Sequence, residues 1–195
     1  FIGNHSSGKM GFAIADRFSS MGADVILVTG PTSQVSQQRG IKRVDVISAA
    51  DMLEACLKYY KDVNACIMSA AVADFTPVNV SAQKIKKQDN ELNIELKKTT
   101  DILKTLGEQK RKGQILVGFA LETNDEEKNA IDKLQRKNLD FIVLNSLNDE
   151  GAGFKTDTNK ITIIDNKLQK ITFELKDKNE VAKDICNKVA ELIKA

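Results

Sequence analysis

Apolar residues change their spacing several times along the chain, and each change predicts a helix or a strand. From Lys9 to Met21 they recur every three or four residues, which is typical of an amphipathic helix, and Gly22 is a usual helix stop. Residues 23–30, ADVILVTG, form a short apolar run rich in β-branched residues and predict a buried strand. Further strands are predicted at 42–46, 64–70, 114–121 and 139–145.

Further helices are predicted between these strands. Ser48 followed three residues later by Asp51 resembles a capped helix start, and apolar positions at helical spacing continue from there to Tyr60. Residues 124–138 begin with acidic side chains and end with basic ones, as the helix dipole favours. The remaining helices are expected from Thr99 or Thr100 to Gly107 and from about Asp177 to the last residues.

The order of these elements indicates an α/β fold. Residues 71–88 show no periodicity, residues 91–97 alternate as a half-buried strand does, and 160–165 with 170–175 predict a hairpin. Because strands alternate with helices and several are apolar on both faces, we expect one mostly parallel sheet covered on two sides, with an antiparallel hairpin near the C-terminal end. In such sheets, ligands bind outside the carboxyl ends of the strands. The loops expected there follow Thr29, Ala70, Leu121 and Asn145.

Length and composition favour a single domain, which we expect to span residues 1–195. The formal charge is +2, because 29 basic residues nearly balance 27 acidic ones, so a general nucleic-acid binder is not expected. No apolar run approaches the length of a membrane span. The three cysteines lie far apart in apolar sequence and the only histidine is His5, which predicts inert thiols in a reducing compartment and no zinc site.

Residues 3–10, GNHSSGKM, match the nucleotide-binding pattern G-x-x-x-x-G-K-[ST] at every position but the last. Its glycines would close backbone N–H groups around phosphates and Lys9 would reach them, but Met10 stands where Mg²⁺ needs a hydroxyl ligand. The stretch directly precedes the first helix, whose free N–H groups would hold an anion whether or not it is a P-loop. A simple capping turn through Ser6 or Ser7 explains the same residues equally well, so both interpretations stay open.

Three further groups carry candidate chemistry, each with a plainer alternative. Residues 68–74, MSAAVAD, leave a strand with small side chains and end on Asp74, which would contact a ribose, a base or Mg²⁺, or be a solvated loop carboxylate. The basic run KIKK at 84–87 lies in a long loop and would neutralise a phosphoryl group, or form a solvated face. Lys133 and Lys137 share one helix face and would bind a polyphosphate, or simply repel each other weakly. No nucleophile or general base stands out, which suits a ligase that works by positioning and charge neutralisation.

Five features together resemble the bacterial phosphopantothenate–cysteine ligases: NHSSGKMGFAIAD, AAVADF, KIKK, GFALETN and the Lys133/Lys137 pair, in this order from Asn4 to about Asn145. The resemblance implies a Rossmann-like fold, a homodimer and a cytoplasmic enzyme of coenzyme A biosynthesis. In the implied reaction CTP, with Mg²⁺, activates the carboxylate of 4′-phosphopantothenate as an acyl-cytidylate and releases pyrophosphate. The amine of L-cysteine then displaces CMP and leaves an amide.

The resemblance also implies roles for particular residues. Asn4 matches the asparagine associated with the acyl-cytidylate, and Lys84 matches the lysine that assists the activation step. The positions expected to contact CTP are Met68, Ser69, Ala70, Asp74, Lys84, Thr100, Asp101, Ile102, Leu103, Phe119, Lys133 and Lys137. On this interpretation GNHSSGKM is the turn for the acyl-phosphate and the substrate, and its match to a P-loop is accidental.

The resemblance extends to what surrounds the ligase domain. In many bacteria this domain is the carboxyl-terminal half of a bifunctional flavoprotein, so fusion to a flavin-dependent decarboxylase stays open, while no flavin is expected to bind this chain. We expect a first strand and a glycine-rich turn ahead of Phe1, without which the sheet is short of a strand. Thr100 stands where many relatives have proline, which makes the loop before Asp101 less rigid. No residues are assigned to Mg²⁺, and neither nucleic acid nor a membrane is an expected partner.

Two other functions fit the same α/β pattern less well. A nicotinamide-dependent reductase would need a glycine-rich turn after its first strand and an acidic residue after its second, but the strand at 23–30 ends in Thr29-Gly30 without that acid. A non-catalytic nucleotide-binding module would bind nucleotide without releasing pyrophosphate, and the KIKK loop argues against it. Within the ligase interpretation, KIKK and Asp74 favour CTP over ATP.

Overall fold

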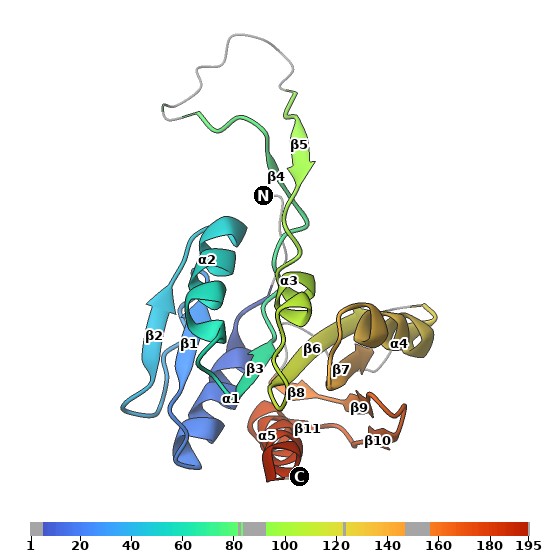
Figure 1. The fold of residues 1–195 in the computed structure, drawn as a ribbon. Coiled ribbons are helices and arrows are strands. Elements are labelled where there is room, and N and C mark those ends of the chain that lie inside the picture. Colours follow the sequence, from blue (N-terminus) through green and yellow to red (C-terminus); the bar gives the residue numbers. More distant parts are fainter. Residues whose placement is uncertain (1–5, 82, 84–92, 123, 147–156, 195) are drawn as a thin grey trace.

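The computed structural model describes residues 6–81, 83, 93–122, 124–146 and 157–194, which form an α/β fold (Figure 1). Its helices are α1 (Lys9–Ser20), α2 (Ala49–Tyr60), α3 (Ile102–Glu108), α4 (Glu126–Arg136) and α5 (Lys178–Lys194). Its strands are β1 (Ile26–Thr29), β2 (Lys42–Asp45), β3 (Ala65–Met68), β4 (Phe75–Pro77), β5 (Leu96–Lys98), β6 (Ile115–Glu122), β7 (Phe141–Ser146), β8 (Thr158–Asn159), β9 (Ile161–Asp165), β10 (Lys170–Thr172) and β11 (Lys176–Asp177). Every helix predicted from the apolar spacing is present.

Five strands form the central sheet, in the order β10-β9-β7-β6-β3. β3 and β7 run parallel to β6, while β9 runs antiparallel to β7 and β10 runs antiparallel to β9. The predicted hairpin is thus confirmed, and it joins the main sheet through β9. The sheet is mixed because the hairpin extends it beyond β7, and its parallel part is smaller than the sequence predicts because it contains only β3, β6 and β7.

Alternate residues of β6 point to opposite faces of the sheet, and helices cover both faces. Leu116 and Ala120 belong to one apolar cluster, together with residues of α2, α3 and α4. Ile115 and Val117 belong to a second cluster, together with residues of α1 and α5. β6 therefore lies between two helical layers, which explains why its sequence is apolar at nearly every position.

β1 and β2 form a separate two-stranded parallel sheet. Among the described residues neither of these strands pairs with β3, although the sequence predicts a single sheet. β1 is as apolar as a core strand, with the sequence ILVT, yet only Thr29 of its residues is buried. This half-exposed apolar strand is the main difference from the predicted fold.

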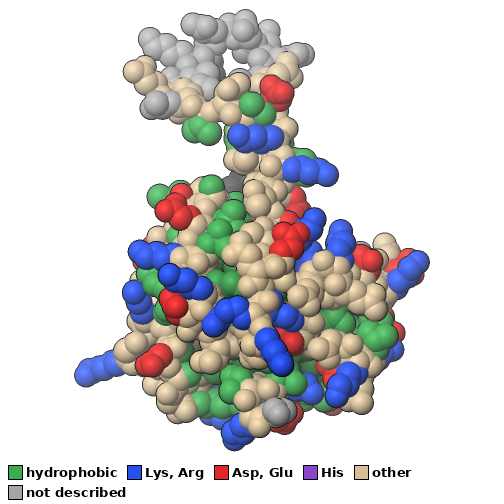
Figure 2. All heavy atoms as spheres, viewed as in Figure 1, with side chains coloured by type: hydrophobic (Ala, Val, Ile, Leu, Met, Phe, Trp, Pro, Cys, Tyr) green, Lys and Arg blue, Asp and Glu red, His purple; other side chains and the backbone are tan. Residues whose placement is uncertain are grey.

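β4 and β5 pair antiparallel and form an arm that projects away from the body (Figure 1). The strand predicted at 91–97 is present in part as β5, but it is exposed rather than half-buried, and the segment 71–88, which shows no periodicity, contains β4. Alternation of apolar and polar residues is typical of a strand that packs one face against a core, whereas the arm does not pack against a core. Figure 2 shows hydrophobic side chains along the arm. The exposed large apolar residues in this part of the chain are Phe75, Val78, Val80, Ile94 and Leu96.

Two helix starts confirm their predicted chemistry. Ser48 and Asp51 form a capping box at α2, in which each side chain accepts a backbone N–H of the other residue. The first turn of α4 carries Glu126 and Glu127, and its last turn is basic, as the dipole favours. These local signals were sufficient because each partner lies within one helical turn.

The start of α3 corrects a prediction. Its cap is Asp101, whose Oδ1 accepts the backbone N–H of Lys104 at 3.0 Å, rather than Thr99 or Thr100. Thr99 instead donates its hydroxyl to the carbonyl of Ala73 at 2.7 Å. Thr99 therefore ties the arm to the loop after β3, a long-range role that its sequence neighbours do not reveal.

The three cysteines are described by the structure, and none of them forms a disulfide. Cys56, Cys66 and Cys186 are free thiols. Burial raises the pKa of Cys56 to about 11 and those of Cys66 and Cys186 to about 12, so all three are protonated and unreactive at neutral pH. In the part of the chain that the structure describes, no helix is both long and apolar enough to cross a bilayer.

Candidate functional site

The structure describes most of the residues that the sequence predicts at the site. Asn4 and Lys84, which were expected to take part in the chemistry, lie outside the described residues, as does the rest of the KIKK run at 84–87. The other positions expected to contact the nucleotide are all described. They come from the ends of β3 and β6, the start of α3 and the end of α4.

The opening turn leads directly into α1. Gly8 adopts a left-handed conformation, with φ 83°, that favours glycine, and α1 begins at Lys9. A hydrogen bond of 2.9 Å from the hydroxyl of Thr32 to the carbonyl of Ser7 holds the turn against the loop after β1. The capping contact from Ser7 is long, 3.5 Å from the Lys9 N–H to Oγ, so capping is a weak explanation for this turn.

Lys9 does not extend from the turn as a P-loop lysine would. Its Nζ lies 2.5 Å from Oδ1 of Asp157, the residue directly before β8. The carbonyl of Asp157 accepts the backbone N–H of Lys178 at the start of α5. Lys178 is 7% exposed, and its burial, followed by the charge of Lys9, lowers its pKa. Lys9, Asp157 and Lys178, the α1–α5 cluster, tie the first helix to the last.

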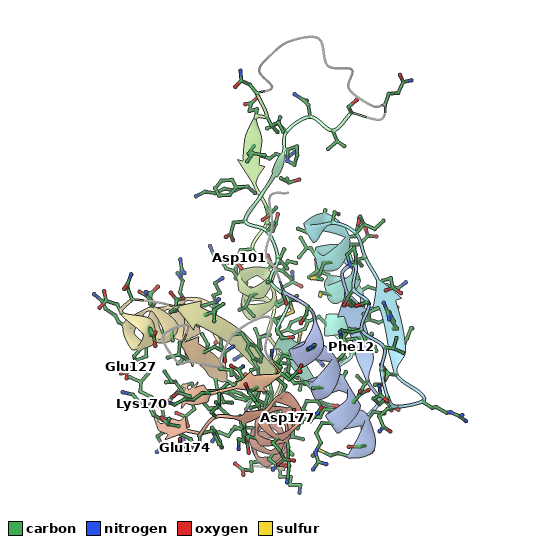
Figure 3. All side chains as sticks on the ribbon, turned by 180° about the vertical axis from the view of Figure 1, so that it is seen from behind. Phe12, Asp101, Glu127, Lys170, Glu174 and Asp177 are labelled. Atoms are coloured by element: carbon green, nitrogen blue, oxygen red, sulfur yellow. The ribbon has the colours of Figure 1, made fainter. Side chains whose placement is uncertain are left out.

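A groove of about 370 Å³ lies beside the α1–α5 cluster, between α1, the loop after β1 and the start of α5. Phe12 and Val35 line it together with two lysines and three aspartates. Figure 3 shows two of the lining residues, Phe12 on α1 and Asp177 just before α5. Because negative side chains outnumber positive ones, the groove does not suit a polyphosphate.

The loop after β3 carries the first group of expected nucleotide residues. Met68, the last residue of β3, and Ser69 are half-buried, whereas Ala70 and Asp74 are exposed. Ser69 lies against α1, since a methyl group added at Gly11 would come within 3.0 Å of its hydroxyl oxygen. This close packing brings α1, and the turn that precedes it, next to the loop.

Lys133, on α4, reaches β6, and Lys137, directly after that helix, reaches the start of α3. Lys133 donates through Nζ to the carbonyl of Phe119 at 2.7 Å, and Lys137 forms an ion pair of 2.6 Å with Oδ2 of Asp101. Burial, followed by the charge of Lys137, lowers the pKa of Lys133, and three carboxylates act in the opposite direction. The α4 lysine cluster consists of Lys133, Lys137, Asp74, Asp101 and Glu122.

Asp101 is held from both sides. One carboxylate oxygen accepts the Lys104 N–H and caps α3, and the other accepts Lys137 Nζ. Partial burial alone would raise the pKa of Asp101, but the hydrogen bonds from Lys137 and Lys104 and the lysine charges outweigh it, so this pKa lies below its ordinary value. Figure 3 shows Asp101 at the start of α3, where the arm meets the body. Asp101 is therefore ionised at neutral pH and partly neutralises the cluster.

A close contact between α3 and α4 positions Lys137. A methyl group added at Gly107 would lie 2.1 Å from the backbone carbonyl oxygen of Lys137, so only glycine allows this approach. Asn138 follows in a left-handed conformation, with φ 52°, and donates from its side chain to the carbonyl of Gly107 at 2.9 Å. The ends of the two helices are thereby locked together beside the cluster.

Some expected nucleotide residues offer their backbone rather than their side chains. Ile102 and Leu103 are core residues, 4% and 8% exposed, in the apolar cluster of α2, α3 and α4. The Phe119 side chain packs against the other apolar cluster, while its carbonyl accepts Lys133. Thr100 is exposed beside the start of α3. A ligand at this position would contact the backbone of the buried residues.

Sequence reasoning missed several polar residues near these groups. Glu122 ends β6 and acts on Lys133, and Asn145 of β7 accepts a side-chain hydrogen bond from Asn159 at 3.2 Å. Glu122 and Asn145 lie where buried strands end, and the rule that sites form at carboxyl ends did indicate the loops after Leu121 and Asn145, although it gave neither side chain a role. Asp157 has no such signal, because its partner Lys9 is 148 residues away.

The fold and the α4 lysine cluster together define an α/β protein with charged side chains gathered at the carboxyl ends of its parallel strands, where phosphorylated ligands are bound in this class. Residues 1–193 match the family model described as the DNA/pantothenate metabolism flavoprotein C-terminal domain. The chain belongs to this family.

Individual relatives cover the whole chain. It is 52% identical over 193 residues to a cysteine/cysteine sulfinic acid decarboxylase from an unknown prokaryotic organism, a match to 99% of the chain and 54% of that protein. It is 48% identical over 195 residues to the coenzyme A biosynthesis bifunctional protein CoaBC of Bacillus subtilis (strain 168), a match to 100% of the chain and 48% of that protein. A crystal structure of the C-terminal domain of CoaBC has a TM-score of 0.81 at 41% identity and covers 97% of this chain and 84% of its own. The chain thus spans about half the length of the curated relatives it matches.

Proposed function

We propose that this chain is a phosphopantothenate–cysteine ligase domain that uses CTP. The supporting observation is the α4 lysine cluster, which gathers two lysines and three carboxylates near the carboxyl ends of β3 and β6 in a member of this family. Two neighbouring cations suit a polyphosphate, and carboxylates beside them suit its Mg²⁺. The CoaBC relatives, named for coenzyme A biosynthesis, support the same reaction.

The proposed reaction forms an amide in two steps. A carboxylate oxygen of 4′-phosphopantothenate attacks the α-phosphorus of CTP, and pyrophosphate leaves with the bonding electrons. The amine of L-cysteine then attacks the acyl carbon, CMP leaves, and the amine loses a proton to solvent. Because charge develops on phosphate oxygens in the first step, fixed cations lower its barrier through position and charge rather than through a covalent enzyme intermediate.

In this proposal Lys133 and Lys137 bind the phosphates that leave as pyrophosphate. Residues 68–70 and 100–103 contact the nucleotide, through the backbone where their side chains are buried. Asn4 hydrogen-bonds the acyl-cytidylate and Lys84 neutralises charge in the activation step. The roles of Asn4 and Lys84 rest on the resemblance, since both lie outside the described residues.

Asp74 is the residue best placed to hold Mg²⁺ with the nucleotide. Its carboxylate is exposed and close enough to raise the pKa of Lys133, whereas Asp101 is already paired with Lys137. Mg²⁺ usually binds through one or two carboxylates and the substrate phosphates, and when bound it neutralises phosphate charge. The proposed reaction requires no flavin in this chain.

We infer a Rossmann-like three-layer arrangement in which a further strand lies between β1 and β3. Among the described residues, β1 pairs with β2 and β3 pairs with β6, which leaves each with one unpaired edge. Both strands are apolar but largely half-exposed, as expected where a neighbouring strand is absent. In the proposal, a segment ahead of Phe1 supplies this strand and the glycine-rich turn, and the parallel part of the sheet becomes continuous.

We place the domain in the cytoplasm, as the ligase part of a longer bifunctional protein. The relatives named above are about twice as long as the match, so each contains a second portion of comparable length. We assign the decarboxylation named for one of them to that second portion, together with its flavin.

Nicotinamide-dependent reduction is the weaker alternative, because β1 ends at Thr29 without the carboxylate that would bind a ribose.

The arm is the proposed contact for a second copy of the chain. Val80 and Ile94 of the arm are 82% and 55% exposed, which favours burial against a partner. Replacing Val80→Asp should yield a monomer in analytical ultracentrifugation where the unaltered protein sediments as a dimer. Val35, 71% exposed on the body, provides the matched control, since Val35→Asp should leave the dimer intact. A dimer that survives Val80→Asp would show that the arm does not form the contact.

Pyrophosphate release tests the proposed activity directly. The full-length protein is mixed with Mg²⁺, 4′-phosphopantothenate and either CTP or ATP, with and without L-cysteine. We expect release that prefers CTP and becomes sustained turnover, with CMP and the amide as products, once cysteine is added. Saturable CTP binding without any pyrophosphate release would instead identify a non-catalytic nucleotide-binding module.

A further inference from the structure

The two lysines of the α4 lysine cluster have different partners. Lys133 donates to a neutral carbonyl, that of Phe119, whereas Lys137 is paired with the carboxylate of Asp101 at 2.6 Å. We propose that Asp101 is a positioning residue that holds Lys137 in place of a phosphate, and that polyphosphate binding exchanges this carboxylate for a phosphate oxygen. The inference rests on the proposed function and deepens it, because it concerns the state of the site before CTP arrives.

Asp101 is able to give up Lys137 without moving. Its other carboxylate oxygen accepts the Lys104 N–H at 3.0 Å and caps α3, and this bond does not depend on Lys137. The backbone of Lys137 is also fixed independently, through its close contact with Gly107. The exchange therefore needs only the Lys137 ammonium group to turn from one oxygen to another.

The exchange weakens polyphosphate binding in two ways. The ion pair must be broken, and the Lys137 side chain is only 11% exposed, so solvent screens this pair less than a surface pair. The carboxylate that remains beside the site also repels the incoming phosphate charge. Both effects predict that removing the charge of Asp101 makes polyphosphate bind more tightly.

The Asp101 carboxylate also stabilises the arrangement of the two lysines in the protein without bound ligand. Without Asp101, Lys133 and Lys137 would be two neighbouring and mostly shielded cations with weaker compensation. With Asp101 ionised, the charge of Lys137 is compensated and its ammonium group stays in one position, ready for the next phosphate. As pyrophosphate leaves, the carboxylate takes Lys137 back, which favours product release.

Asp101→Asn tests the proposal, because asparagine keeps the helix cap and removes the charge. Isothermal titration calorimetry of the full-length protein with CTP and Mg²⁺ should show binding about 3- to 10-fold tighter than for the unaltered protein. In steady-state assays the KM for CTP should fall while kcat does not rise. Asp101→Ser also caps a helix and should change affinity in the same direction, which guards against a folding defect peculiar to one variant.

Two controls separate this effect from a general change in charge. Asp132→Asn removes the same charge from α4, where Asp132 pairs with the exposed Arg136 at 3.6 Å, and should alter affinity less than twofold. In a Lys137→Gln background, Asp101→Asn should lose most of its gain, because the interaction it relieves is already gone. A gain of undiminished size without Lys137 would overturn the exchange mechanism, because repulsion between the carboxylate and the phosphate would then account for the whole effect.

The outcomes also distinguish this inference from the proposed function. Inorganic tripolyphosphate serves as a second probe, since the exchange involves only phosphate charge. If the unaltered protein binds tripolyphosphate but not CTP, the proposed function fails, and tighter tripolyphosphate binding by Asp101→Asn still supports the exchange. Unchanged binding by folded Asp101→Asn and Asp101→Ser would show that the carboxylate does not compete with phosphate for Lys137. Weaker binding would show that the Asp101 carboxylate itself contacts the ligand or its metal, and either result would overturn the exchange. If neither probe binds the unaltered protein, both proposals fall.

Discussion

The α4 lysine cluster and the α1–α5 cluster are built from similar parts and differ in how those parts are held. In each, one lysine has a lowered pKa, caused first by burial and next by the neighbouring lysine; Lys133 is half-buried and Lys178 is buried. In each, the second lysine pairs with an aspartate, Lys137 with Asp101 and Lys9 with Asp157. The difference lies in shielding, because the exposed fractions of the side chains are 11% and 45% in the first pair but 36% and 78% in the second.

This difference in shielding distinguishes a ligand-binding site from a structural contact between distant segments. The α4 lysine cluster holds two cations one helical turn apart, beside a capping aspartate that cannot drift away, and so presents fixed charge to a ligand. The α1–α5 cluster joins three distant segments through one exposed carboxylate, and exposed pairs contribute little to stability. We infer that the first cluster binds the ligand and that the second positions the turn before α1.

Lys133→Met should have the largest effect, because it removes a fixed cation from the site while keeping the length of the side chain. We expect kcat/KM for CTP to fall about 100-fold, the scale for losing one charge-stabilising group. Folding should be preserved, since methionine suits a mostly buried position. Arg136→Met on the same helix is the control, as Arg136 is exposed and should change activity less than twofold. Equal losses in both variants would remove the distinction between the site and the rest of α4.

Gly107→Ala tests whether the α4 lysine cluster depends on the close approach of two helices. The added methyl group would meet the Lys137 carbonyl at 2.1 Å, so the free energy of unfolding should fall by about 3 kcal/mol. The loss should appear in urea denaturation although alanine is the better helix former. Gly30→Ala is the matched control, because nothing lies within 4 Å of the methyl group there. A stabilised Gly107→Ala variant would show that α3 and α4 separate at little cost.

Asp157→Asn should have a smaller effect on activity, through the turn that Lys9 follows. We expect the KM for 4′-phosphopantothenate to rise about threefold with kcat nearly unchanged, since an exposed pair is lost. Asp157→Glu should restore most of the affinity because it keeps the charge. Asp24→Asn, an exposed aspartate ahead of β1, should have no effect. A rise in the KM for CTP instead would place the α1–α5 cluster at the nucleotide.

The pH dependence of stability should show the smallest effect, at Asp101. Its folded pKa lies below the ordinary value of 3.8, so the ionised form contributes stability above that value and loses it as pH falls through the lower folded pKa. Asp101→Asn should therefore be less stable than the unaltered protein by about 0.5 kcal/mol at neutral pH, and the gap should close as the pH is lowered into the acid range in which the carboxylate is protonated. Urea denaturation across this range measures the gap. In a Lys137→Gln background most of this gap should be absent, and a gap that stays constant as the pH is lowered through this range would contradict the ion-pair explanation.

Sequence reasoning succeeded where the physical partners lie close together along the chain. Ser48 caps α2 through Asp51, three residues away, and Lys133 and Lys137 share a face because they are one turn apart. The apolar run of β6 predicted a strand buried on both faces, and alternate side chains do enter two separate apolar clusters. Spacing alone carries these facts, because a helix repeats every 3.6 residues and a strand every two.

Contacts between residues far apart in the sequence determine features that the local spacing of apolar and polar residues does not predict. The sequence could not show that Thr99 ties the arm to Ala73, that β1 stays apart from β3, or that Lys9 meets Asp157. In each case the partner lies too far along the chain for any local pattern to mark it. The resemblance to the ligases implied that Lys133 and Lys137 belong to the site, but it did not imply that Lys137 is paired with Asp101.

The sequence by itself therefore determined the helices, most strands and the residue types available to bind a phosphorylated ligand. Tertiary structure decided which carboxylate meets which lysine and which ion pairs are shielded from water. The physical reason is that propensity and periodicity act over a few residues, whereas electrostatic strength depends on distance and burial in the folded chain. Asp101 shows both levels at once, as a cap that local sequence could specify and a counter-ion that only the packing of α3 on α4 creates.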